Sequence, residues 1–232
     1  MAGANSDLKL LGAGPSPYVN RVQIALNLKS VDYEFLEEKY GSKSKLLLKS
    51  NPVHKKIPVL IHGNQPICES LVIVQYIDEY WTSGPFILPS DPYDRALHRF
   101  WAAYIDDKLP SNMKELIMAE GEEPKQAAVE RIAEGMALLE EALGKCSKGK
   151  PFFGGDNIGD LDIAFGSFLG GLRAIEKLAS VTLFIEAKTP GLVAWADAFS
   201  SHEAVKDVIL ETVKLVEVVK MFKARALPQS AN

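Results

Sequence analysis

The feature that most constrains this chain is a segment rich in proline, glycine and serine, Ser83–Pro92, which separates two different sequence patterns. Before it, short apolar runs of strand length alternate with amphipathic stretches of helical period. After it, every apolar pattern has the helical period. A chain that changes period across such a segment is expected to fold as two domains. We therefore predict an α/β domain at residues 1–83, a linker at 84–92 and an all-helical bundle at 93–232.

The first half predicts a compact βαβαββα unit. Its strands are expected at 8–11, 33–36, 57–61 and 66–67, and its helices at 19–29, 46–48 and 70–81. A helix joins the first two strands, so these strands should be parallel. The turn signal Gly63-Asn64 makes the last two strands an antiparallel hairpin.

The second half predicts helices only. Apolar residues recur at helical spacing over 97–109, 129–143, 161–178, 193–199 and 213–222. The stretch Leu161–Leu178 is apolar almost all round, and such a helix is buried on every side. We therefore predict one central helix there, with the others packed around it.

Bulk composition indicates an ordinary soluble protein and excludes several classes of function. Of the 232 residues, 47% are hydrophobic and 24% are charged, as in globular domains. A net charge of −4 and a pI near 5.7 argue against nucleic acid or an anionic membrane as the main partner. No run approaches the ~18 apolar residues of a transmembrane helix, and the N-terminus lacks the pattern of a signal peptide. We expect a cytosolic protein.

The two cysteines suggest neither a disulfide framework nor a metal site. Cys68 and Cys146 have no second cysteine or histidine at ligand spacing, so a structural zinc site is not expected and we predict no metal. Cys68 is interpreted as a small buried hydrophobe. Cys146 is interpreted as an incidental thiol in a surface loop.

A candidate binding site occupies the stretch from Asn51 to Ser70. A basic loop there leads through Ile57-Pro58 into an apolar strand, and an X-Pro bond in this setting is a candidate cis peptide. A cis bond would leave the Ile57 backbone free to pair with an extended, peptide-like ligand. Glu69-Ser70 would add a carboxylate, a hydroxyl and a helix N-terminus, which suit an ammonium and a carboxylate on one molecule. From these residues alone, a buried strand, a turn and a capped helix explain the stretch equally well.

Taken together, the motifs resemble the plant tau class of cytosolic glutathione transferases. The resemblance is carried by Ser16-Pro-Tyr, Asn51-Pro-Val-His-Lys-Lys-Ile-Pro-Val-Leu, Glu69-Ser70 and Phe100-Trp-Ala-Ala-Tyr-Ile-Asp-Asp107. It covers nearly the whole chain. It implies a thioredoxin-like N-terminal domain, an all-helical C-terminal domain and a homodimer. It also implies glutathione as co-substrate and no permanently bound cofactor.

The resemblance gives Ser16 a catalytic role. Its hydroxyl would donate a hydrogen bond to the glutathione sulfur and stabilise the thiolate over the thiol. From the sequence alone, Ser16 also fits a helix N-cap, because it lies where a strand ends and a helix begins. In this family, serine rather than cysteine at this position favours conjugation over thiol–disulfide chemistry.

The same resemblance implies contacts to the glycyl and cysteinyl parts of glutathione. Lys43 and Lys56 would hold the glycine carboxylate. Ile57 would pair its backbone with the cysteinyl unit, in a conformation made possible by a cis peptide at Pro58. Without the resemblance, each lysine would be interpreted as an ordinary solvated surface residue.

The γ-glutamyl end of glutathione is assigned to Glu69 and Ser70. Glu69 would bind the ammonium group. Ser70, at a helix N-terminus, would bind the carboxylate. These roles suit the charges of glutathione, which carries one ammonium and two carboxylates.

Asp162 is expected to be structural. It lies in Gly159-Asp-Leu-Asp162, where the family places a capping box at the start of a helix. The cap residue is glycine rather than serine or threonine, so half of the box is missing. Its contribution to stability is therefore expected at the low end for capping motifs.

The pocket for the electrophile is where the chain departs from the tau pattern. Positions that often hold large aromatic residues in this class are Gly14, Met113, Leu116 and Gly171 here. Each lost indole removes about 150–250 Å² of aromatic surface, so we expect a wider pocket unless neighbouring side chains have repacked. The full set of expected pocket residues is Gly14, Pro15, Tyr104, Lys108, Asn112, Leu116, Gly171 and Phe222.

The leading hypothesis is conjugation of reduced glutathione to hydrophobic electrophiles, in xenobiotic detoxification and the stress response. The rate would come from a lowered thiol pKa and from proximity of the reactants. Two alternatives remain open: a glutathione-dependent reductase of organic hydroperoxides, and a non-catalytic carrier of hydrophobic ligands. An interaction module without glutathione conflicts with the presence of all six glutathione-site positions.

Overall fold

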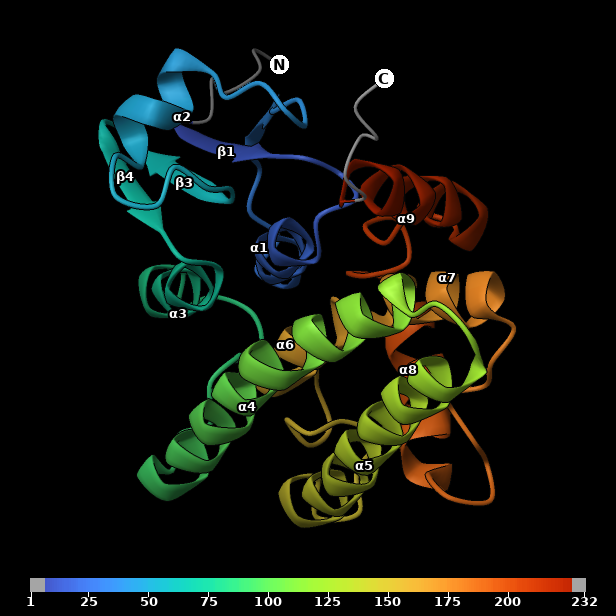
Figure 1. The fold of residues 1–232 in the computed structure, drawn as a ribbon. Helices are drawn as coiled ribbons and strands as arrows, with labels where there is room; N and C mark the ends of the chain where they lie inside the picture. Colours follow the sequence, from blue (N-terminus) through green and yellow to red (C-terminus); the bar gives the residue numbers. More distant parts are fainter. Residues whose placement is uncertain (1–6, 227–232) are drawn as a thin grey trace, which may run out of the picture.

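The computed structural model describes residues 7–226, and its first domain is a four-stranded mixed sheet covered by helices (Figure 1). The elements follow the predicted order: β1 (Leu8–Gly12), α1 (Pro17–Leu28), β2 (Glu34–Glu37), α2 (Lys45–Ser50), β3 (Val59–His62), β4 (Gln65–Cys68) and α3 (Ser70–Tyr80). The strands lie in the order β2-β1-β3-β4. β1 pairs with β2 in parallel, and β3 pairs antiparallel with β1 and β4. The predicted parallel pair and hairpin are confirmed.

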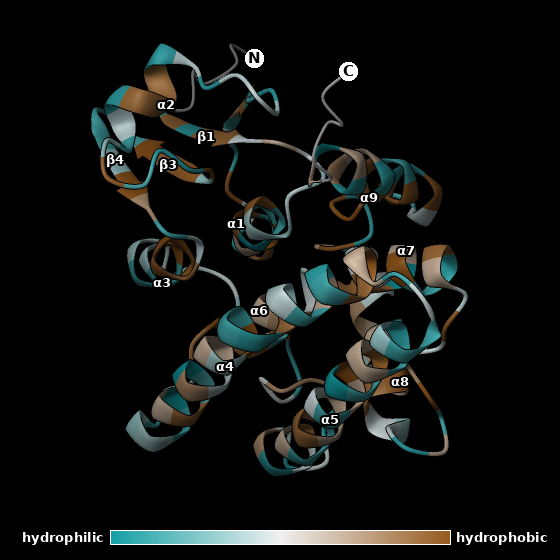
Figure 2. Ribbon diagram, in the orientation of Figure 1, coloured by the Kyte–Doolittle hydropathy of each residue, from teal (hydrophilic) through white to brown (hydrophobic). Residues whose placement is uncertain are grey.

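The two central strands of the sheet, β1 and β3, are buried on both faces. Leu10 and Leu60 pack into the main core with α1 and α3, whereas Leu11, Val59 and Leu47 of α2 form a smaller cluster. Because successive strand residues point to opposite faces, a strand that is apolar throughout needs cover on both sides. β3 is hydrophobic over most of its length (Figure 2), and α1 lies between the sheet and the helical domain (Figure 1).

The second domain contains helices only within the described residues. They are α4 (Pro92–Met118), α5 (Glu122–Cys146), α6 (Asp160–Gly166), α7 (Leu169–Ala179), α8 (Pro190–Ser201) and α9 (Thr212–Ala226). α4 lies beside α5, and α9 packs against α7 at the end of the bundle nearest α1 (Figure 1). Within residues 7–226, no helix is both long enough and apolar enough to cross a membrane.

The single central helix that the sequence predicts is broken into α6 and α7. The buried Arg21 of α1 donates from Nη2 to the Ala164 carbonyl oxygen at 2.8 Å and from Nε to Ser167 Oγ at 3.2 Å. The Ser167 hydroxyl donates to the same carbonyl at 3.2 Å. The N–H of Phe168 pairs instead with the carbonyl of Phe165, three residues back, at 3.0 Å. Arg21, which lies outside this segment, therefore occupies the Ala164 carbonyl oxygen that a continuous helix would use. The helical periodicity of the segment does not reveal such a contact.

Asp162 fixes the start of α6 through four hydrogen bonds. Its Oδ1 accepts from the Phe153 N–H and the Trp195 indole N–H, both at 2.8 Å. Its Oδ2 accepts from the N–H groups of Gly154 at 2.8 Å and Gly159 at 2.9 Å. Burial raises the pKa of this carboxyl to about 6, although all four bonds oppose the shift. The prediction that Asp162 contributes little to stability is therefore corrected, because three of its four hydrogen-bond donors lie outside the capping box.

A buried ion pair holds the linker against the first domain. Lys29 Nζ, at the end of α1, lies 2.7 Å from Asp78 Oδ1 on α3. The two oxygens of Asp78 also accept hydrogen bonds from the N–H groups of Ile87 at 2.9 Å and Leu88 at 3.0 Å. The extended chain between α3 and α4 is thereby anchored by one carboxylate.

A second buried pair joins α4 to the first residue of α6. His98 Nδ1 lies 2.6 Å from Asp160 Oδ1. Burial acts to lower the His98 pKa, but hydrogen bonds with Asp160 and Cys146 outweigh it and raise the pKa to about 9. A histidine whose pKa rises on folding stabilises the fold fully below its unfolded pKa of ~6.5 and loses this effect as pH rises through the folded value.

We predict that loss of the proton on His98 lowers the free energy of unfolding by on the order of 3 kcal/mol as pH rises from about 6 to about 9.5. Urea unfolding of the protein and of His98→Asn at both pH values measures the effect. The variant should be clearly less stable near pH 6, and the gap should narrow near pH 9.5. An equal gap at the two pH values would show that His98 is not the titrating group.

Candidate active site

Ser16 occupies the N-cap position of α1, yet its hydroxyl does not cap the helix. Its φ of −81° and ψ of 119° are extended, and its side chain makes no capping hydrogen bond. The Ser16 carbonyl accepts from the N–H groups of Val19 at 3.1 Å and Asn20 at 3.0 Å. The capping interpretation is therefore wrong for this side chain. A hydroxyl in a residue only 8% exposed is left available to a ligand.

The basic loop after α2 is organised by Asn51. The Oδ1 of this buried side chain accepts from the His54 N–H at 3.0 Å, and its Nδ2 donates to the Lys56 carbonyl oxygen at 2.9 Å. The next peptide bond, Ile57-Pro58, is cis. β3 begins directly after this proline, so Ile57 lies outside the strand ladder.

Glu69 and Ser70 form the turn into α3. The Glu69 backbone has φ 71° and ψ 116°, a region that costs a residue with a side chain about 1–3 kcal/mol. The Glu69 carboxylate is 61% exposed, and His54 Nε2 lies 3.8 Å from it. Ser70 is buried and begins α3. The first N–H groups of that helix have no intrahelical partners and carry partial positive charge.

These segments meet around a polar cleft of about 280 Å³. It is lined by Tyr18, Lys56, Ile57, Pro58, Glu69, Ser70 and Asp106. The structure thus brings together the predicted binding residues from the loop and from the turn into α3. Lys43 does not line the cleft and is exposed just before α2. Ser16 is also absent from the lining, two residues before Tyr18.

A buried guanidinium lies behind this cleft. Arg21 donates from Nη2 to Asp106 Oδ1 at 2.6 Å, from Nη1 to Asp106 Oδ2 at 3.0 Å, and from Nη1 to Ser70 Oγ at 3.2 Å. Its guanidinium carbon lies 5.2 Å from the ring centroids of Tyr18 and Phe168. One cation therefore supports three residues that line the cleft. The sequence reasoning missed this role of Arg21. The feature that could have indicated it is an arginine on the apolar face of a predicted helix, three residues after Tyr18.

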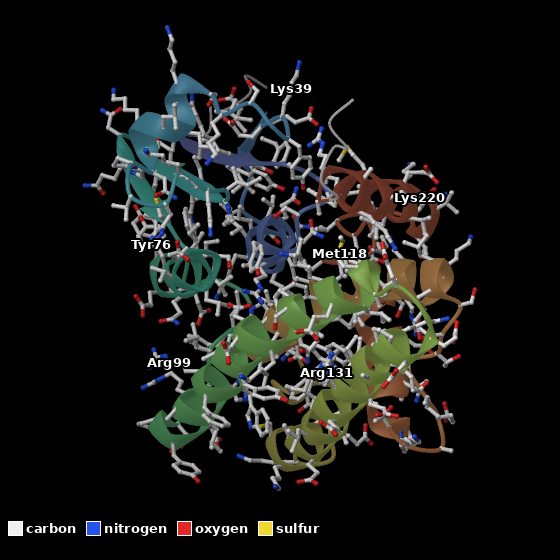
Figure 3. All side chains as sticks on the ribbon, in the orientation of Figure 1. Lys39, Tyr76, Arg99, Met118, Arg131 and Lys220 are labelled. Carbon is white, nitrogen blue, oxygen red and sulfur yellow. The ribbon has the colours of Figure 1, made fainter. Side chains whose placement is uncertain are left out.

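A larger, mostly apolar cavity of about 400 Å³ is lined by residues from the start of α1, the end of α4, the α6–α7 junction and α9. Met118, at the end of α4, is one of its walls (Figure 3). Tyr18 lines this cavity as well as the polar cleft. Burial raises the Tyr18 pKa, the Asp106 charge raises it further and Arg21 opposes both. Its phenol is therefore protonated at neutral pH.

Some of the predicted pocket residues line this cavity and others do not. Pro15, Gly171 and Phe222 are in its walls. The predicted residues that are absent from its walls are Gly14, Tyr104, Lys108, Asn112 and Leu116. The residues of α4 that line the cavity are instead Pro110, Met113, Lys114, Ile117 and Met118. The predicted set on α4 follows a neighbouring stripe of the same helix, and Leu116 from that stripe is buried in the core.

Gly14 and Gly171, two glycines at positions where the tau class is expected to carry aromatic residues, differ in their surroundings. A Cβ added to Gly171 would lie 3.0 Å from Met113 Cε, whereas one added to Gly14 would meet nothing within 4 Å. The flexible Met113 side chain therefore occupies part of the space beside Gly171. The space beside Gly14 stays open.

Comparison with known proteins identifies the family. Residues 6–79 match the family described as Glutathione S-transferase, N-terminal domain, and residues 122–198 match Glutathione S-transferase, C-terminal domain. The chain belongs to the glutathione S-transferase family. The expected two-domain fold of this family is thereby confirmed.

Individual relatives point to the tau class. The crystal structure of a tau class glutathione S-transferase from mango, Mangifera indica, is 64% identical, covers 94% of this chain and 99% of its own, and has a TM-score of 0.91. Glutathione S-transferase U17 from Arabidopsis thaliana is 60% identical over 94% of this chain and 96% of its own. A rice glutathione S-transferase, solved in complex with glutathione, is 37% identical, covers 95% and 100% of the two chains, and has a TM-score of 0.87. The resemblance to the tau class is confirmed.

We predict that Arg21→Met lowers the free energy of unfolding by about 3 kcal/mol or more, because it leaves buried acceptors without their shared cation. Arg131→Met is the matched control. Arg131 lies on the surface (Figure 3) in an ion pair with Glu115 at 2.6 Å in which both side chains are about half exposed. Such a pair contributes less than about 1 kcal/mol. Urea denaturation measures both variants, and equal losses would show that Arg21 is not a central support.

Proposed function

We propose that this glutathione S-transferase conjugates reduced glutathione to hydrophobic electrophiles. The observation that carries the proposal is that the polar cleft and the apolar cavity share Tyr18 as a wall. The cleft offers charged and backbone groups to a peptide, and the cavity offers apolar surface to a second substrate. Conjugation needs these two reactants side by side. The related rice enzyme, solved in complex with glutathione, supports the choice of peptide.

In this proposal, the cleft holds glutathione along its length. Lys56 and, from its exposed loop, Lys43 bind the glycine carboxylate. The Ile57 backbone pairs with the cysteinyl unit beside the cis peptide. Glu69 binds the γ-glutamyl ammonium, while Ser70 and the N-terminus of α3 bind the γ-glutamyl carboxylate.

The Ser16 hydroxyl then donates a hydrogen bond to the glutathione sulfur. This bond and the positive end of α1 favour the thiolate, which is the reactive form. The sulfur attacks the electrophilic carbon, a C–S bond forms, and the leaving group departs with the bonding electrons. Where the electrophile is an alkene conjugated to a carbonyl, a proton adds to the neighbouring carbon instead. Ser16 forms no covalent bond in either case.

We predict that Ser16→Ala lowers kcat/KM for conjugation by roughly 10²–10³-fold, the effect of losing one donor to a developing anion. Glutathione should still raise the melting temperature of the variant, because most of its contacts remain. Ser16→Thr keeps the hydroxyl and is the control, with part of the activity retained. Full turnover by Ser16→Ala would overturn the assignment of Ser16.

The cavity supports a second prediction, on the size of the electrophile. Gly170, Gly171 and Met113 form part of its wall, and they leave more room than aromatic side chains would. We expect faster turnover with a bulky apolar electrophile than with a small nitroaromatic one. Gly171→Phe should fill part of the cavity and reduce this ratio. A clear preference of the unmodified protein for the small substrate would contradict the prediction.

The cavity also favours one alternative function, the non-catalytic carriage of hydrophobic ligands. Its walls are mostly apolar and would bind a ligand without chemistry. Unmeasurable conjugation and peroxide reduction, together with tight binding of an apolar fluorophore, would favour this alternative. Turnover of organic hydroperoxides with little conjugation would favour the reductase.

The cellular setting is proposed from membership of the family. It comprises a cytosolic location and roles in xenobiotic detoxification and the stress response. We also propose a homodimer, in which the first domain of one subunit meets the helical domain of the other. Exposed apolar side chains on α3 and α4, Val72, Tyr80 and Phe100, support this association. Sedimentation that detects only monomers at micromolar concentration would overturn it.

A further inference from the structure

Cys146 is part of a buried group of polar side chains. It is the last residue of α5 and is partly buried, so the predicted position in a surface loop is wrong. Its thiol and the His98 imidazole line the same cavity, Cys146 helps to raise the His98 pKa, and His98 Nδ1 lies 2.6 Å from Asp160 Oδ1. A thiol, an imidazole and a carboxylate thus lie in series. This is the arrangement of a nucleophile beside an imidazole that a third group orients.

The thiol and the imidazole face a cavity of their own. His98 and Cys146 line a space of about 400 Å³ between the linker, the first turns of α4 and the loop after α5. This cavity shares no lining residue with the polar cleft or with the large apolar cavity. Its volume suits an adduct of tripeptide size. Within residues 7–226, no cluster of histidine, cysteine and acidic side chains could hold a metal ion.

Charged groups from several elements surround this cavity. They are Asp91, Asp94, Lys148 and Lys150 in its lining and Asp160 behind His98. The pKa of His98, raised to about 9 by its hydrogen bonds against the effect of burial, keeps the imidazole protonated at neutral pH. A protonated histidine beside the thiol is placed to give its proton to a thiolate that leaves during exchange.

The two lysines can serve an anionic ligand. Lys148 pairs with Asp94 at 2.9 Å and Lys150 pairs with Asp156 at 3.0 Å. Both lysine side chains are more than half exposed, and exposed pairs of this kind contribute little to stability. Either lysine can therefore turn to a carboxylate of an entering peptide at little cost.

We propose that Cys146 is a modification site, at which thiol–disulfide exchange with glutathione disulfide attaches one glutathionyl group. The Cys146 thiol gives its proton to water, its sulfur attacks one sulfur of the disulfide, and a new S–S bond forms as the old one breaks. The departing glutathione thiolate takes the proton that His98 holds. The products are a mixed disulfide at Cys146 and one reduced glutathione. The step uses none of the residues assigned to conjugation.

Cys68 is an internal control for this chemistry. It is also partly buried, but burial raises its pKa and the charge of Glu69 raises it further. Its Sγ lies 3.6 Å from the Ser50 carbonyl oxygen, which accepts a hydrogen bond and gives the thiolate no support. Cys68 should therefore react slowly where Cys146 reacts fast.

The test is incubation of the folded protein with excess glutathione disulfide at about pH 7, followed by mass spectrometry of the intact chain and its peptides. One glutathionyl group should appear on the unmodified protein and on Cys68→Ser, and none on Cys146→Ser. His98→Asn should slow the reaction at least about tenfold, because it removes the proton donor. Asp160→Asn, which keeps a hydrogen-bond acceptor for the imidazole but removes the negative charge, should slow it less.

Comparison with a peptide keeps the test informative if either variant is unstable. An ordinary thiol loses rate about tenfold per pH unit below its pKa of ~8.5, and a peptide spanning residues 141–150 supplies that reference. Cys146 in the folded protein should react at least about tenfold faster than the peptide at pH 7, because His98 gives a proton to the leaving thiolate. A rate equal to that of the peptide, a reaction mainly at Cys68, or an unchanged rate in folded His98→Asn would each overturn the proposal. Ser16→Ala should react as the unmodified protein does, which separates this outcome from that of the conjugation assay.

Discussion

The buried guanidinium of Arg21 is the interaction on which much of the structure depends. It extends from a helix of the first domain to a carboxylate on α4 and to the carbonyl and hydroxyl that end α6. Residues of the helical domain thus pack around a cation that belongs to the first domain. The same group contacts the serine that begins α3. This one side chain consequently contributes both to the junction of the two domains and to one wall of the polar cleft.

This arrangement separates two tasks. The proposed peptide contacts come from the first domain, on segments fixed by Asn51 and by the turn at Glu69. The apolar cavity takes most of its walls from α4, α7 and α9. Tyr18 is common to both spaces. Substitutions on α4, α7 and α9 can therefore change which second substrate the cavity would accept, while the contacts proposed for the peptide stay the same.

Local patterns predicted the fold well where local forces decide it. The order βαβαββα followed from apolar runs and turns, and the cis candidate at Ile57-Pro58 followed from proline chemistry. The failures arose where distant groups act. The break before Phe168 needs Arg21, and Cys146 matters only because α4 brings His98 beside it. The stripe of α4 that faces the cavity depends on helix rotation, which apolar spacing on a long helix leaves open.

The backbone at Glu69 has a wider consequence. Its left-handed φ of 71° is one that glycine adopts without steric cost, and a chain selected for stability alone would carry glycine there. Retaining a carboxylate instead means that this protein tolerates local strain to keep a charge at the mouth of the cleft. The strain at this one residue is thus tied to the role proposed for Glu69 in binding glutathione, a link that burial and packing do not reveal.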